Sequence, residues 1–321
     1  MKVYVKTPAR LHFGLIDLNG ELGRFFGGLG VGVDVPNVVL EAEESETFSV
    51  TGENCERVTH FTEKFLETYK ITSNVKINVK QTIPEHIGLG SGTQLALAVA
   101  SALSKLFNVN TSIQELSLAM GRMKRTGVGT AIFEQGGFVI DGGKQAQSGK
   151  VLPESLPPLI VRRAFPEDWK FVVAVPNVKK GLAKTEENSA FANVEPMPDT
   201  VVGQVCRLIM MKLLPALMDR DINAFGGALT KLQMVVGDCF ADVQGGTFSS
   251  PEAATTINFM KNCGAYGVGQ SSWGPAVYGL VQGETQAKQL LQAVEYFLKN
   301  NGGGQVFVAN PDNKGATIKL V

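Results

Sequence analysis

The first half of the chain carries a strand, a glycine-rich loop and a helix in that order. Residues 75–80 alternate between apolar side chains at 75, 77 and 79 and polar ones between them, which predicts a half-exposed strand. After the loop, leucine and valine recur at 95, 99, 103 and 106 with helical spacing. A capping box at Ser112 and Glu115 predicts a second helix with an apolar face that extends to Met123. The apolar run 138–140 predicts another strand.

The second half mixes helices with strands. Strands are predicted at 171–175, 276–280, 306–308 and 317–320, and helices from 199 to a proline at 215, over 222–236, from 250 to 264 and around 290–297. A proline-rich connection over 151–166 places a boundary near 165, so the expected domains are residues 1–165 and 166–321. This order of elements indicates an α+β fold whose second domain is ferredoxin-like.

Composition excludes several classes of protein. The 321 residues suffice for about two domains. The 30 Lys and Arg residues balance 30 Asp and Glu residues, so the expected partners are small molecules and not nucleic acid or a membrane. The four cysteines form no CxxC pair and do not combine with the three histidines as zinc ligands. No apolar run is expected to span a bilayer, and no signal-peptide core opens the chain, so we expect a cytoplasmic protein with reduced thiols.

The glycine-rich loop is a candidate phosphate site. A loop of this kind at the start of a helix directs backbone N–H groups and the positive end of the helix dipole at one spot. The candidate phosphate-binding residues are Gly88, Leu89, Gly90, Ser91, Gly92 and Thr93. The loop matches neither the Walker A motif nor G-x-G-x-x-G. Glycine beside serine or threonine is also common at helix starts, so a plain helix start remains the alternative.

Four other places in the chain carry candidate site residues. Arg10 and His12 share one face of an extended N-terminal segment, and five glycines follow between residues 20 and 30, which favours a site. Cations at 122, 124 and 125 indicate either a site or a solvated helix end. Glu134 precedes a glycine pair and is a candidate site carboxylate. The segment 267–274 holds a glutamine, two serines and a tryptophan, which favours a ligand loop over a plain hairpin turn.

The arrangement of these segments resembles a known superfamily. The N-terminal strand at Pro8-Ala9-Arg10-Leu11, the loop from Pro84 to Thr93 and the late Gly-x-Gly loop are similar to the three motifs of the GHMP kinase superfamily. More narrowly, five strings resemble the β-ribofuranosylaminobenzene 5'-phosphate synthase family, and they span residues 9–17, 88–94, 133–138, 165–169 and 269–275. The resemblance covers nearly the whole chain and implies a two-domain GHMP-kinase-like fold with the phosphate loop in its N-terminal domain.

The narrower resemblance implies a decarboxylating pentosyltransferase. Such an enzyme joins 5-phosphoribosyl 1-diphosphate to 4-hydroxybenzoate or 4-aminobenzoate and releases CO₂ and diphosphate, an early step of methanopterin biosynthesis. Mg²⁺ is expected to arrive with the diphosphate, its protein ligands are left unassigned, and no organic cofactor is expected. The string Thr126-Gly127-Val128-Gly129 has glycine where kinases such as mevalonate kinase often carry an aspartate. An ATP-dependent small-molecule kinase of the same superfamily is the alternative function, and a non-catalytic sensor is a third.

For this chemistry the candidate catalytic residues are Arg10, His12 and Glu134, with His86 as a further candidate base. Arg10, Arg24 and Arg125 are alternatives for anion clamps, Trp273 is a candidate to stack on the benzoate ring, and Gln270 is a candidate to bind its polar groups. The full set of candidate substrate-binding residues is Asp17, Arg24, Arg125, Gln270, Ser271, Ser272 and Trp273. A homodimer is the expected assembly for an enzyme of this size.

Overall fold

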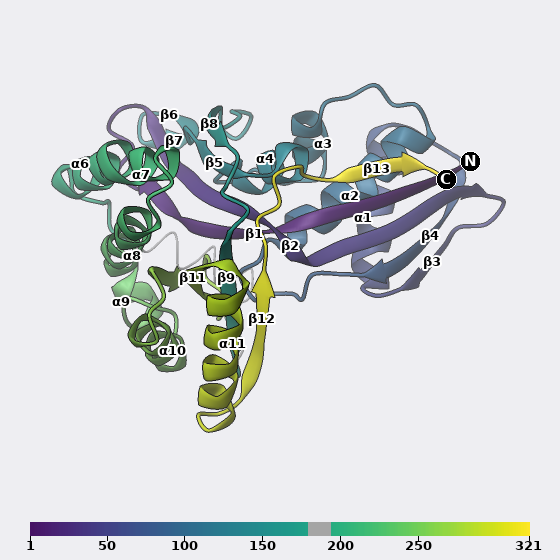
Figure 1. Ribbon diagram of the computed structural model, residues 1–321. Coiled ribbons are helices and arrows are strands. Elements are labelled where there is room, and N and C mark those ends of the chain that lie inside the picture. The colour runs from purple at the N-terminus through teal and green to yellow at the C-terminus, as the bar shows by residue number, and fades with distance from the viewer. Residues whose placement is uncertain (179–193) are drawn as a thin grey trace.

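The computed structural model describes residues 1–178 and 194–321, which form two β-sheets and the helices that cover them (Figure 1). The larger sheet has the order β13-β1-β2-β4-β3, with β5, β6, β7 and β8 attached through β2, and the smaller sheet has the order β10-β11-β9-β12. The strands of the larger sheet are β1 (Lys2–Asp17), β2 (Arg24–Ser45), β3 (Ser49–Gly52), β4 (Asn74–Gln81), β5 (Phe138–Asp141), β6 (Lys144–Gln147), β7 (Lys150–Val151), β8 (Leu159–Arg163) and β13 (Thr317–Leu320). The strands of the smaller sheet are β9 (Trp169–Pro176), β10 (Gly267–Gln270), β11 (Val277–Gln282) and β12 (Gly304–Ala309).

The helices fall into a group on each sheet. Those of the first half are α1 (Cys55–Thr68), α2 (Ser91–Leu106), α3 (Ile113–Ala119) and α4 (Val128–Gln135). Those of the second half are α6 (Asp199–Leu208), the π-helical turn η1 (Ile209–Leu213), α7 (Leu214–Met218), α8 (Ile222–Asp238), α9 (Ala241–Gln244), α10 (Pro251–Asn262) and α11 (Gly283–Lys299). Helix α2 packs against β1 and β2, and its apolar face is buried along nearly its whole length.

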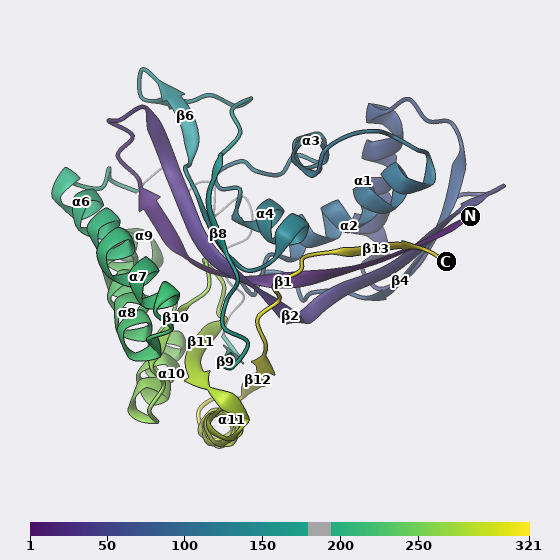
Figure 2. The same cartoon turned by 45° about the horizontal axis from the view of Figure 1, so that its top comes forward.

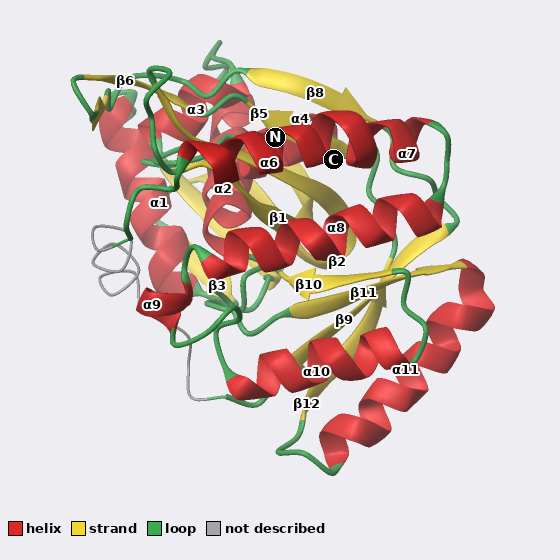
Figure 3. Ribbon diagram, turned by 90° about the vertical axis from the view of Figure 1, so that its left-hand side faces the viewer, coloured by secondary structure: helices red, strands yellow, loops and turns green. Residues whose placement is uncertain are grey.

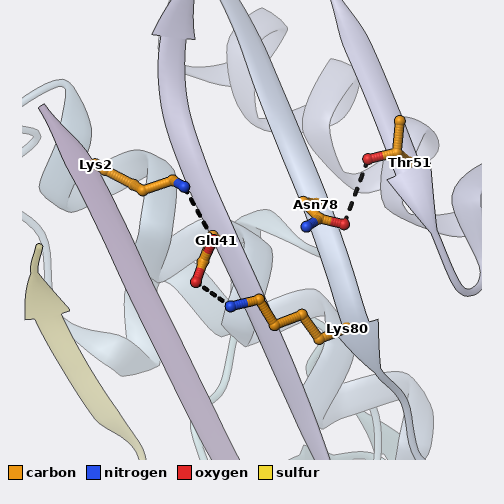
Figure 4. Close-up of polar contacts among 5 residues, drawn as sticks. All are labelled: Lys2, Glu41, Thr51, Asn78 and Lys80. Carbon is orange, nitrogen blue, oxygen red and sulfur yellow. Dashed lines mark hydrogen bonds and ion pairs between the residues drawn. The ribbon is translucent and has the colours of Figure 1, made fainter.

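At the end of the larger sheet formed by residues 2–6, 39–44 and 74–81, the face that points away from α2 is polar. Glu41 on β2 forms ion pairs with Lys2, at 3.0 Å, and with Lys80, and Thr51 Oγ1 donates a hydrogen bond to Asn78 at 3.4 Å (Figure 4). The strand predicted at 75–80 is confirmed as β4, whose apolar side chains are buried on the helix side. This end of the sheet therefore has one face in the core and one face in solvent, as its alternating sequence requires.

The smaller sheet confirms the ferredoxin-like expectation. Its strands follow the chain as β9, β10, β11 and β12 but lie in the order β10-β11-β9-β12, and all neighbours are antiparallel. Helices α10 and α11 pack together with this sheet around a second apolar cluster. Figure 3 shows α8 between the strands of the larger sheet and β10, and it contacts both β1 and β10. The predicted α+β fold class is therefore confirmed.

One aromatic cluster joins the two halves of the chain. Phe225 on α8 lies 6.2 Å from Phe138 on β5, 5.5 Å from Phe165 and 5.3 Å from Trp169, measured between ring centroids. The last strand, β13, also returns to the larger sheet, where Ile318 lies opposite Val5 of β1. The division at residue 165 stays a prediction, and these contacts show that residues on both sides of it share a core.

Several elements differ from the sequence-based predictions. The helix expected to reach Met123 ends at Ala119, and Gly121 and Met123 both have positive φ angles, of 69° and 57°. Helices α1 and α4 and the long strand β2 were not predicted; glycines flank α4 and interrupt β2. The chain from Pro84 into α2 and the elements predicted after residue 170 are confirmed in order.

One helical stretch bears on the expectation that no segment spans a membrane. Among the described residues, Asp199–Met218 is long and apolar enough to do so by length and composition alone. Figure 2 shows α6 and α7, which make up this stretch with η1, alongside α8. Val205, Leu208 and Leu213 bury their side chains in the protein core, so packing explains part of this apolar composition. The expected cytoplasmic location stays a prediction.

The shared core predicts that both halves unfold together. We expect Phe225→Ala to lower the free energy of unfolding by about 3–5 kcal/mol, because it leaves a cavity between the sheets. Met234→Ala on the same helix is the control, since that side chain is 42% exposed, and it should change stability by no more than about 0.5 kcal/mol. Urea unfolding followed by circular dichroism should show one transition, and two separate transitions of which only one shifts would contradict the shared core.

Candidate active site

The loop before α2 forms a cradle of backbone N–H groups. Gly88 and Gly90 have φ angles of 88° and 82°, which glycine adopts without strain, and helix α2 begins directly after Gly90. The N–H groups of Thr93 and Gln94 donate to the carbonyl oxygen of Gly90, both at 3.1 Å. Within the described chain, the N–H groups of residues 88–92 have no protein acceptor. They are therefore available to an anion at the positive end of the helix.

Arg10 ties the N-terminal strand to this cradle. Its Nη1 donates a hydrogen bond of 2.6 Å to the carbonyl oxygen of Gly88, and its backbone N–H donates to the carbonyl of Leu89 at 3.2 Å. A Cβ atom added at Gly90 would lie 2.8 Å from Cγ of Arg10. The glycine at 90 is thus required both by its φ angle and by the side chain of Arg10.

Two further guanidinium groups lie beside the first turn of α2. A Cβ atom added at Gly92 would lie 3.1 Å from Nη2 of Arg57 and 3.3 Å from Nη2 of Arg122. Arg122 donates from Nε to Thr93 Oγ1 at 3.2 Å, and Arg57 on α1 pairs with Glu85 at 2.6 Å. The cradle therefore combines backbone N–H groups with three guanidinium groups, a donor set that matches phosphate oxygens.

The predicted arginines are placed differently from one another. Arg10 lies at the cradle, whereas Arg24 donates from Nη1 to the carbonyls of Gly142 and Gly143 at 3.2 and 2.7 Å. Arg125 lies in the connection between α3 and α4 that also carries Arg122. Sequence reasoning missed Arg57 because the helix that carries it was not predicted, and it left Arg122 within a cluster of cations without a role.

Residues 267–270 of the predicted ligand loop form strand β10 of a hairpin with β11, and the turn that follows packs against the cradle. Ser271 Oγ accepts a hydrogen bond from the backbone N–H of His12 at 2.9 Å and donates to the carbonyl of Gly88 at 2.7 Å. Gln270 accepts from the N–H of Ser249 and donates to the carbonyl of Ser272, both at 2.8 Å. These side chains are engaged with protein atoms, which favours a supporting role, and their contact with substrate stays a prediction.

Trp273 lies on the same loop and packs edge-on against Phe240, with ring centroids 5.1 Å apart. Gly274 follows it at a point where no side chain fits, because a Cβ atom there would lie 2.1 Å from the carbonyl carbon of Ile87. The backbone of this loop is therefore in direct contact with the backbone of the cradle. Stacking of Trp273 on a substrate ring stays a prediction.

His12 is buried at a bulge of β1, where the pairing with β2 shifts register before Gly14. Its Nδ1 accepts a hydrogen bond from the N–H of Gly14 at 3.2 Å, which assigns the proton of the neutral ring to Nε2. Burial, and then the charge of Arg10, lower the pKa of His12 to about 3. A neutral imidazole with Nε2–H is a hydrogen-bond donor and a weak base. The predicted general-base role of His12 stays a prediction that these observations do not favour.

Glu134 and Asp17 lie away from the cradle. Helix α4 starts beside Thr93, but Glu134 is near its other end, where Oε2 accepts from Nε2 of Gln114 at 2.8 Å. Asp17 ends β1 about 16 Å beyond His12 at the usual rise of a strand, and Oδ1 accepts from the N–H of Asn19 at 2.6 Å. The structure does not bring these two carboxylates to the phosphate loop, and their predicted roles in the reaction stay untested.

The turn that precedes α4 is stabilised by hydrogen bonds to the buried side chain of Asp141. Asp141 accepts hydrogen bonds from the N–H groups of Gly127 and Gly143, both at 2.9 Å. Burial raises the pKa of Asp141 to about 6, although these backbone donors oppose the rise. A Cβ atom at Gly129 would lie 3.2 Å from Cγ2 of Thr93, so this glycine faces the start of α2. The carboxylate nearest to this turn therefore supports the backbone and does not face the cradle.

The described residues contain no cluster of three or more histidine, cysteine or acidic side chains that could hold a metal ion by themselves. Oxygen atoms that suit Mg²⁺ are nevertheless present at the cradle, on Ser91, Thr93 and Glu85. A metal that brings oxygen ligands of its own on a diphosphate needs few from the protein.

Comparison with known proteins gives the family. The family models for the N-terminal and C-terminal domains of GHMP kinases match residues 56–139 and 213–300. A mevalonate kinase of Methanococcus jannaschii has the same fold, with a TM-score of 0.69 over 97% of this chain and 98% of its own at 16% identity.

Two proteins named β-ribofuranosylphenol 5'-phosphate synthase are much closer in sequence. That of Archaeoglobus fulgidus is 35% identical over 98% of this chain and 99% of its own length, and that of Methanothermobacter thermautotrophicus is 33% identical over 98% of both. The chain therefore belongs to the β-ribofuranosylphenol 5'-phosphate synthase family, within the GHMP kinase superfamily.

Proposed function

We propose that this protein transfers a phosphoribosyl group from 5-phosphoribosyl 1-diphosphate to a 4-substituted benzoate, with release of CO₂ and diphosphate. The observation that carries the proposal is the convergence of free N–H groups and three guanidinium groups at the start of α2. The names of the relatives refer to a ribofuranosylphenol product, which favours 4-hydroxybenzoate over 4-aminobenzoate as the acceptor. The reaction belongs to the early part of methanopterin biosynthesis.

Departure of the diphosphate is the step that the cradle suits best. As the bond from the anomeric carbon to oxygen breaks, negative charge grows on the diphosphate oxygens. The N–H groups of residues 88–92 and the guanidinium groups of Arg57 and Arg122 lie where they can stabilise that charge. They are held in place before the substrate arrives, so little reorganisation is needed during the reaction.

The electrons for the new carbon–carbon bond come from the aromatic ring of the acceptor. The ring carbon that bears the carboxylate attacks the anomeric carbon, and the electron pair of the carboxylate bond restores the aromatic ring as CO₂ leaves. A base that takes the proton of the 4-hydroxyl group makes this attack easier, and the proton returns to the phenol product. His86, on the cradle itself and 53% exposed, is better placed for this exchange than the buried His12, which can donate a hydrogen bond from Nε2.

Mg²⁺ remains part of the proposal as a companion of the diphosphate. It supplies charge neutralisation of the leaving group when bound. Ser91, Thr93 and Glu85 are the side chains at the cradle whose oxygens fit it. A homodimer, with small molecules as ligands and neither nucleic acid nor membrane as partner, also stays a prediction.

The kinase alternative is less well supported. The structural likeness to mevalonate kinase, at 16% identity, shows the fold alone. Phosphoryl transfer to an alcohol is assisted by a base near the acceptor hydroxyl, and the turn at 126–129 carries none.

A direct assay separates these functions. Purified protein with Mg²⁺, 5-phosphoribosyl 1-diphosphate and carboxyl-labelled 4-hydroxybenzoate should release labelled CO₂ and diphosphate in equal amounts. The same protein with ATP and a panel of alcohols should form no ADP. ADP formation without release of CO₂ would replace the proposed function by the kinase alternative.

Gly90→Ala should weaken the binding of 5-phosphoribosyl 1-diphosphate. The added Cβ atom meets Arg10 and requires an unfavourable φ angle, so we expect a rise in KM of at least about tenfold, comparable to the loss of one charge-assisted hydrogen bond. Gly227→Ala on α8 is the matched control, because a Cβ atom there meets nothing within 4 Å. Steady-state kinetics and thermal melts should be compared. An unchanged KM in a folded Gly90→Ala protein would remove the loop from the binding site.

The burial of His12 predicts a pH dependence of stability. The unfolded chain binds a proton near pH 6.5 and the native state only near pH 3, so the free energy of unfolding should fall as the pH drops below 6.5, by up to about 1.4 kcal/mol per unit. His12→Asn lacks this contribution, so its stability relative to wild type should improve between about pH 7 and 5. Urea unfolding at several pH values measures it.

His60→Asn, which replaces an exposed imidazole on α1, is the control and should keep the wild-type pH dependence of stability.

The kinetics of the same variants test the role of His12 in the reaction. We expect His12→Asn to lower kcat by less than about tenfold, whereas loss of a general base costs about 10²-fold or more. A fall in kcat of about 10²-fold or more, together with the loss of the acidic limb of the pH–rate profile, would show that His12 is the general base.

A further inference from the structure

Glu85 brings a carboxylate to a cradle that is otherwise lined by guanidinium and N–H groups. Its Oε1 lies 2.6 Å from Nη1 of Arg57, and its Oε2 lies 3.6 Å from Nε2 of His86. The side chains of Arg57 and Glu85 are each 31% exposed, so water reaches the ion pair. Glu85 also begins the loop whose N–H groups face the expected anion.

The guanidinium group of Arg57 reaches both Glu85 and the first turn of α2. Nη1 of Arg57 holds Glu85, while Nη2 lies where a Cβ atom of Gly92 would be 3.1 Å away, at the first turn of α2. A partly exposed ion pair contributes little stability, so an incoming anion can displace the carboxylate at small cost. Phosphate oxygens accept charge-assisted hydrogen bonds from arginine, as carboxylate oxygens do. Glu85 thus competes with a diphosphate for Arg57.

We propose that Glu85 is a specificity-determining residue that makes the cradle favour the magnesium complex of a diphosphate over the metal-free anion. The inference rests on the proposed function, because it assigns a diphosphate to the cradle. Without a metal, a bound diphosphate faces the carboxylate of Glu85 as a like charge and must also displace it from Arg57. When Mg²⁺ accompanies the diphosphate, the displaced carboxylate of Glu85 can interact with this cation, which prefers oxygen ligands, in place of Arg57.

Charge balance gives this exchange its direction. Three guanidinium groups without an acid at the cradle would attract any phosphate, including free inorganic phosphate and the diphosphate product. The carboxylate of Glu85 lowers the affinity of the cradle for metal-free phosphates. It restores that affinity when a cation accompanies the ligand, because the cation attracts the carboxylate. Binding of the metal and binding of the diphosphate are therefore coupled through Glu85, and the coupling acts equally in both directions.

Calorimetric titration with inorganic diphosphate, with and without Mg²⁺, measures this coupling without turnover. Glu85→Gln should bind metal-free diphosphate more tightly than wild type. The factor by which Mg²⁺ improves affinity should fall at least about fivefold, the lower end of typical coupling between two ligands. In an Arg57→Gln background the gain in metal-free affinity should be smaller, because the competition for Arg57 is then absent.

Asp168→Asn is the matched control, since Asp168 forms an exposed ion pair with Arg220 at 2.7 Å outside the cradle. It removes the same charge and should leave both affinities unchanged. An equal Mg²⁺ factor in wild type and Glu85→Gln would overturn the inference while leaving the diphosphate cradle in place. The same change in Asp168→Asn as in Glu85→Gln would also overturn it, as an effect of net charge. Wild-type protein that binds diphosphate under neither condition would overturn the proposed function together with the inference.

Discussion

Two hydrogen-bond donors hold the carbonyl oxygen of Gly88, and the cradle depends on them. Arg10 donates from β1 and Ser271 from the loop between β10 and β11, at 2.6 and 2.7 Å. The N–H groups that follow this peptide have no acceptor among the described residues, so they remain available to a ligand. The first strand and a loop near the end of the chain must therefore both be in place before the anion site exists.

The titratable and charged groups near the site are of two kinds: buried groups fixed by their surroundings, and partly exposed groups that can change partners. His12 is kept neutral by burial, and Asp141 is enclosed by backbone donors behind the turn into α4. Arg57 and Glu85 are instead partly exposed and paired with each other. The groups with fixed charge states and contacts give the cradle its shape. The Arg57–Glu85 ion pair can open, so it makes the cradle respond to the charge of the ligand that binds.

The sequence predicted the fold far better than it predicted the site. The period-2 pattern of β4 comes from burial of one face of the strand, and α2 is buried on nearly all sides, with its large apolar side chains at helical spacing. Helix α4 was missed because it is short and begins and ends at glycines. The phosphate loop was identified because backbone geometry requires glycine at a few fixed positions.

Side-chain roles were less predictable, because they depend on contacts between distant segments. Gln270 and Ser271 look like ligand residues in the sequence, yet their polar atoms bind the protein itself. Arg57 looks like an ordinary surface cation on a helix, yet its guanidinium reaches Gly92. A sequence gives the type of each group, but only the fold gives the direction in which it points.

The return of β13 to β1 has a consequence for biosynthesis of the chain. Residues 2–6 of β1 are synthesised long before residues 317–320, their partner on one side, emerge from the ribosome. In Figure 1 this yellow strand lies along the purple start of β1, and the backbone N–H of Val321 donates to the carbonyl of Lys2 at 2.9 Å. For most of translation β1 therefore presents an open edge that other strands could join. Chaperones that shield nascent strands should matter more for this protein than for one whose first sheet closes early.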